Sequence, residues 1–195
     1  LPRAAYYIEH QKMDEFKKLS RKALNFVFLV ASPMMIYFML FAKQGIYFLS
    51  GDAFGPAVVP MQLIMPTLLL IGITNILGIQ ILVPLGYEKA VLVSEIVGAI
   101  IDLVVNALLI PHYQSSGAAI GTLLAEFAVM VVQCIALKNE IKTAFSDIKY
   151  LKIILAIILA SLASFWVTAL NLHVFITLVI SAILFFGVYG LVLII

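Results

Sequence analysis

Long runs without a charged residue dominate this chain and decide which solvent it folds in. Of 195 residues, 64% are hydrophobic and 11% are charged, whereas a soluble domain carries about 25% charged residues. The apolar runs reach the roughly 20 residues that an α-helix needs to cross a bilayer. An open sheet would leave its backbone polar groups unsatisfied in lipid. The sequence therefore predicts an all-α, polytopic membrane protein.

Six transmembrane helices are predicted, forming one bundle. They comprise residues 24–42, a segment within 53–87, and residues 90–110, 117–137, 153–170 and 174–195. Residues 1–23 are expected to be a cytoplasmic segment before the bundle (24–195), with a short amphipathic basic helix at 13–22 lying along the membrane surface. The chain starts without Met and ends inside an apolar run, so we expect it to be part of a longer protein.

The basic residues predict the orientation of these spans. Lys and Arg are enriched on the cytoplasmic side of membrane proteins. Of the 12 Lys and Arg residues, Lys43 alone falls on one predicted side. The others precede the first span or lie in the second-to-third and fourth-to-fifth loops, the last of which holds Lys138, Lys142 and Lys149, with Lys152 at its edge. Both ends of this multi-pass chain are therefore predicted to face the cytoplasm.

The second span combines helix breakers with amides. Pro66 removes a backbone hydrogen bond, so a kink is expected there, and Gly72 is a second candidate for helix bending. Asn75 and Gln80 carry amides that lipid does not solvate. Two interpretations stay open: a static kink packed in a bundle, or a bending helix that lines a transport path.

Polar residues of the third span fall on one stripe. At 100° per residue, Glu95, Gly98, Asp102 and Asn106 lie within an arc of about 80°. A carboxylate at mid-bilayer costs at least about 2.5 kcal/mol. We therefore expect this stripe to face a partner or a watery cavity, although Glu95 is close enough to the cytoplasmic end to reach water.

The fourth span carries two distinct faces. Thr122, Glu126 and Gln133 share one of them. The other is a ridge of small residues suited to close helix packing, formed by Gly117, Gly121 and Ala125. Glu95, Asp102 and Glu126 are thus candidates for lining a hydrophilic path or binding a coupling cation, H⁺ or Na⁺. The alternative is hydrogen bonding between helices.

The chain lacks the sequence patterns of an enzyme. It has no nucleophile arrangement, phosphate-binding loop or metal-ligand spacing, and its three His residues are far apart. We expect no catalytic residue, no metal site, no cofactor and no nucleic-acid partner.

Four motifs resemble one known family. They are G-x-x-F-x-x-A-x-x-x-x-x-L at 51–63, N-x-L-G-x-Q-x-L-x-P-L-G at 75–86, N-x-x-L-I-P at 106–111 and G-A-A-I-x-T-L-x-A-E at 117–126. In this order the chain resembles the C-terminal half of bacterial polysaccharide repeat-unit flippases of the O-antigen type. These belong to the multidrug, oligosaccharidyl-lipid and polysaccharide exporter superfamily. Asp102 departs from the family pattern, in which an uncharged residue such as Asn is commoner before N-x-x-L-I-P.

The resemblance implies a function and partners. Such proteins have two helical bundles around a central cavity and move undecaprenyl-diphosphate-linked oligosaccharide across the bacterial inner membrane by alternating access. The partners implied are this lipid-linked substrate, membrane lipids and a missing N-terminal bundle, in which we expect most basic cavity residues. Two alternatives remain: a cation-coupled multidrug exporter of the same superfamily, whose cationic substrates suit Asp102 and Glu126, and a non-transporting scaffold for polysaccharide assembly.

Overall fold

Helices form nearly all of the described chain. The computed structural model describes residues 2–138, 145, 150–170 and 172–194, so Lys142 and Lys149 lie outside it. Within these ranges there is no strand, which confirms the all-α prediction. The elements are α1 (Pro2–Glu9), α2 (Met13–Leu40), α3 (Ala42–Ser50), η1 (Asp52–Ala57), α4 (Val58–Ile64), α5 (Thr67–Asn75), η2 (Ile76–Leu82), α6 (Glu88–Leu137), α8 (Tyr150–Phe165), η3 (Trp166–Leu170) and α9 (Val174–Ile194).

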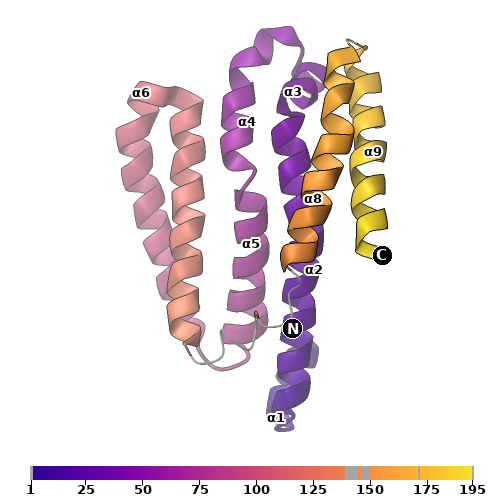
Figure 1. Cartoon of the computed structure of the whole chain (residues 1–195). Helices are drawn as coiled ribbons and strands as arrows, with labels where there is room; N and C mark the ends of the chain where they lie inside the picture. The colour runs from indigo at the N-terminus through magenta and orange to yellow at the C-terminus, as the bar shows by residue number, and fades with distance from the viewer. Residues whose placement is uncertain (1, 139–144, 146–149, 171, 195) are drawn as a thin grey trace.

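The apolar helices match the predicted spans. Five helical stretches of the described chain are long and apolar enough to cross a membrane, and the longest, α6, joins two helices at a kink. α6 is a hairpin at one edge of the bundle, beside α4 and α5, and α8 and α9 pair at the opposite edge (Figure 1). Counting the two legs of α6 separately gives the six spans that the sequence predicts.

The first span is longer than expected. Residues 13–22, predicted as a separate surface helix, form the first turns of α2, which runs unbroken from Met13 to Leu40. No glycine or proline interrupts the chain between these residues and the apolar part of the helix, so the backbone continues across the change in charge. That residues 1–23 lie in the cytoplasm stays a prediction.

The second span is broken where the sequence places its proline. α4 ends at Ile64, and α5 begins at Thr67, just after Pro66. The Thr67 hydroxyl donates to the Ile64 carbonyl at 2.6 Å and so gives it a partner at the break. Gly72, which we expected to bend the helix, instead lies inside the unbroken α5. A Cβ on Gly72 would come within 2.7 Å of Val27 Cγ1, so this glycine allows α5 to pack closely against α2.

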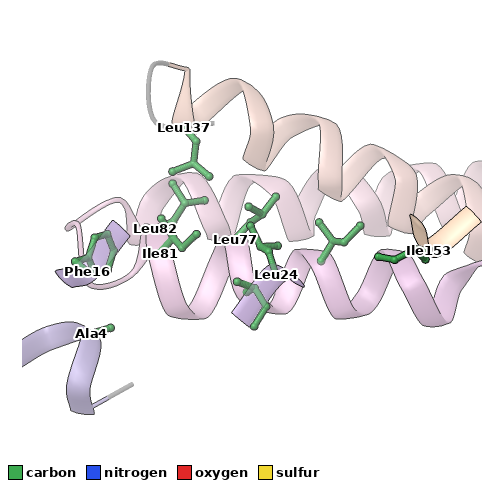
Figure 2. Packing of buried hydrophobic residues seen from close by; sticks show 10 residues of the cluster. Ala4, Phe16, Leu24, Leu77, Ile81, Leu82, Leu137 and Ile153 are labelled. Atoms are coloured by element: carbon green, nitrogen blue, oxygen red, sulfur yellow. The ribbon is translucent and has the colours of Figure 1, made fainter. Parts of the chain in front are cut away.

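The span then continues as a π-helix, η2. Its wider turns contain one more residue per hydrogen-bonded ring than α-helical turns, as in the bond from Val83 N to the Gly78 carbonyl. η2 contributes the centre of the larger hydrophobic core. Its residues Leu77, Ile81 and Leu82 are buried and pack toward Leu24 of α2 and Leu137 of α6 (Figure 2).

Two tyrosines fasten α9 to α2. Tyr37 donates from its hydroxyl to the Leu178 carbonyl at 2.9 Å, and Tyr189 donates to the Leu29 carbonyl at 2.8 Å. The second bond has a specific cause. The Leu29 carbonyl would ordinarily accept the N–H of residue 33, but that residue is proline and has none. Tyr189 therefore satisfies a carbonyl that Pro33 leaves without its helical donor.

Candidate functional site

The predicted third and fourth spans fold back on each other as the two legs of α6. The reversal occurs at Gln114, whose backbone (φ 48°, ψ −125°) is not helical. Helical conformation otherwise continues through Pro111, so the turn is shorter than residues 111–116, which separate the two predicted spans. A short turn brings the polar stripe of the first leg directly against the second leg.

Glycines set the distance between the two legs. Gly117 has no space for a side chain, since a Cβ there would lie 2.6 Å from the backbone carbonyl carbon of Leu109. At Gly121 the place of a Cβ is taken by Asn106 Oδ1, with Asp102 Oδ1 at 3.3 Å. Gly98 of the first leg packs in the same way against Val129. The predicted ridge of small residues is therefore a packing face, and its partner is the polar stripe.

A polar groove of about 250 Å³ runs between the legs. It brings together three carboxylates that the sequence placed on two separate helices, of which Glu95 is exposed and Asp102 and Glu126 are half-buried. Its lining contains no Lys, Arg or His and consists of Glu95, Gly98, Ala99, Asp102, Thr122, Ala125, Glu126 and Val129. The groove is therefore acidic along its whole length.

One end of the groove holds two buried oxygens. Asp102 Oδ1 and Asn106 Oδ1 are inaccessible to solvent and accept no conventional hydrogen bond. Both lie at Gly121, so its Cα–H points at side-chain oxygens and can supply a weak Cα–H···O contact. The second oxygen of Asp102 is not among these buried atoms, and Asp102 itself lines the groove. The Asp102 side chain thus joins the glycine interface to the open groove.

The other candidate residues do not line the groove. Asn106 lies one turn beyond it, packed on Gly121. Asn75 is exposed and donates from Nδ2 to the carbonyl of Ile71 in its own helix at 2.8 Å. Gln80 is half-buried on η2. The structure therefore brings together the acidic candidates and leaves the second-span amides elsewhere.

Gln133 is a polar contact that the sequence did not identify. We grouped it with Thr122 and Glu126 on one face, but it is buried where α6 packs on η2, with Nε2 bonded to Ser94 Oγ at 3.3 Å. Gly78 of η2 leaves room for this amide, since a Cβ there would lie 3.0 Å from Nε2. The sequence did contain a signal for this contact, because Ser94 and Gln133 both lie near the predicted cytoplasmic ends of consecutive spans. This pair serves helix packing rather than the groove.

The described helices and this groove define a multi-pass α-helical membrane protein. Within the described ranges, no group of three His, Cys, Asp or Glu side chains is close enough to hold a metal ion. No protein-family model, curated protein or solved structure matches the chain. Sequence motifs and the groove are therefore what bear on its function.

Proposed function

We propose that this chain is the C-terminal half of a transporter that exports undecaprenyl-diphosphate-linked oligosaccharide repeat units across a bacterial inner membrane. The single observation that carries a transport role is the groove at Glu95, Asp102 and Glu126. Carboxylates within membrane spans are costly, and they are retained where they face a watery path or a partner. A purely structural polar contact would be closed, as it is at Gln133, whereas the groove is open.

The choice of substrate rests on the motifs between residues 51 and 126, which resemble those of the polysaccharide repeat-unit flippases. In this proposal both ends face the cytoplasm, following the distribution of Lys and Arg. The bundle rocks against a second bundle, and the broken helix α4–α5 lies beside the α6 hairpin that carries the groove. The substrate diphosphate requires basic partners, and the groove lining contains none. The second bundle supplies them.

The acidic lining favours a second candidate, a cation-coupled multidrug exporter of the same superfamily. A cationic drug, or a coupling H⁺ or Na⁺, is attracted by carboxylates within a low-dielectric wall, whereas a diphosphate is repelled. In the flippase the same carboxylates bind the coupling cation. In the drug exporter they contact the substrate.

The test is export by the full-length protein in a strain that lacks its repeat-unit flippase. Restored surface polysaccharide supports the flippase, and loss of restoration in Asp102→Asn or Glu126→Gln supports a role for the groove. Asp52→Asn is the matched control, because Asp52 is an exposed carboxylate in η1 outside the groove. Failure to restore polysaccharide, together with new resistance to cationic drugs, would select the multidrug exporter.

A further inference from the structure

A second groove lies between α2 and α8. It encloses about 340 Å³. Its lining carries no charged side chain and includes Phe28, Met35 and Ile36 of α2 with Tyr150, Ile154 and Ile158 of α8. This groove is chemically unlike the acidic one and shares no lining residue with it.

The dimensions of the groove fit a single hydrocarbon chain. Its α2 wall extends from Phe28 to Ile36, which at 1.5 Å per residue is about 12 Å. That length is close to one leaflet of the roughly 30 Å hydrocarbon layer. Dividing the volume by this length gives a mean cross-section of about 28 Å², that of a circle about 6 Å across, whereas a helix with its side chains is about 10–12 Å across. A polypeptide helix therefore does not fit inside it, and an acyl chain does.

Basic residues follow the same face of α2 beyond one end of the groove. At 100° per residue, Lys17, Lys18 and Arg21 fall within the arc of about 100° that contains the α2 wall residues. Arg21 precedes Phe28 by seven residues, or about 10 Å along the helix. At this end the rings of Phe28 and Tyr150 meet edge to face at 5.4 Å, and tyrosine is typical of the membrane–water boundary. The surface thus changes from apolar to basic in the order of a lipid tail and an anionic headgroup.

We propose that this groove binds one acyl chain of an anionic phospholipid, with the phosphate headgroup at the exposed Lys18. Long basic side chains reach headgroups from the ends of membrane helices, and each basic residue near an anionic surface contributes about 1 kcal/mol. The lipid occupies the leaflet that meets the first turns of α2. It seals the contact between α2 and α8 where their side chains leave a gap.

The test is photocrosslinking of the full-length protein in nanodiscs containing phosphatidylglycerol with a diazirine in its acyl chain. Peptides of α2 and α8 are expected to carry the label. Ile154→Trp, which fills the groove, is expected to lower this labelling several-fold, and Ile158→Trp applies the same test further along. Leu155→Trp is the matched control, because Leu155 is as exposed as Ile154 on the same helix but does not line the groove.

A second arm tests the headgroup. Lys18→Gln is expected to weaken labelling by phosphatidylglycerol but not by the zwitterionic phosphatidylcholine probe. Lys89→Gln replaces an exposed lysine in the first turn of α6 and is expected to change neither. Equal labelling of wild type and both tryptophan variants would overturn the proposal. Displacement of the probe by undecaprenyl diphosphate at equal concentration would also overturn it, because the groove would then hold the tail of a polyprenyl lipid.

Discussion

Replacing Gly117 with alanine tests how closely the two legs of α6 pack. The added methyl group would lie 2.6 Å from both the carbonyl carbon and the carbonyl oxygen of Leu109. These are backbone atoms of a helix, so no rotamer change removes the overlap. Ordinary contact begins at about 3.5 Å, and the legs must separate by about 1 Å. Overpacking of this kind costs about 1–3 kcal/mol.

The matched control is Gly187→Ala in α9. It makes the same chemical change in a membrane helix, and a Cβ at Gly187 meets no atom within 4 Å. Because alanine is a better helix former than glycine by about 1 kcal/mol, this control is expected to be neutral or stabilising. The measurement is the free energy of unfolding of the full-length protein, from denaturant titration in mixed micelles. If Gly117→Ala proved as stable as Gly187→Ala, the close approach at Leu109 would be refuted.

Two further predictions concern carbonyls beside a proline that accept a side-chain hydroxyl, and both are measured by the same titration. Tyr189→Phe is expected to cost about 1–2 kcal/mol, because the Leu29 carbonyl then loses its partner. In a Pro33→Ala background, which restores the N–H, the cost should fall toward the roughly 0.6 kcal/mol usual for side-chain bonds in membranes; equal costs in both backgrounds would contradict this account. Thr67→Val is expected to cost about 1 kcal/mol by removing the donor to Ile64, and a neutral result would mean that another donor replaces it.

The positions of the helices could be predicted because lipid imposes a minimum apolar length. Apolar runs with few or no charged residues placed all six spans, and Pro66 marked the break in the second. The extent of α2 could not be read from the same signal. Hydropathy changes near residue 23, whereas helix propensity does not change there, and the backbone follows propensity.

The groove could be predicted only in part. Periodicity placed Glu95 and Asp102 on one face and Glu126 on another helix. The pattern along one helix does not show which other helix that face packs against. Gly117 and Gly121 were recognisable as a packing ridge, yet that they pack on the polar stripe depends on the reversal at Gln114. The π-helical winding of η2 left no signal in the sequence that we identified.

The α6 hairpin has a mechanical consequence for the acidic groove. The two legs of the hairpin, which form the walls of the groove, pack closely against each other at glycines that leave no space for a side chain. The hairpin as a whole packs on α4, α5 and η2. That support is interrupted at Pro66 and is under-wound, as a π-helix, at η2. If this support tilts, both walls of the groove therefore move together as one rigid body. The carboxylates would then change their depth in the membrane, while the shape of the groove would stay the same.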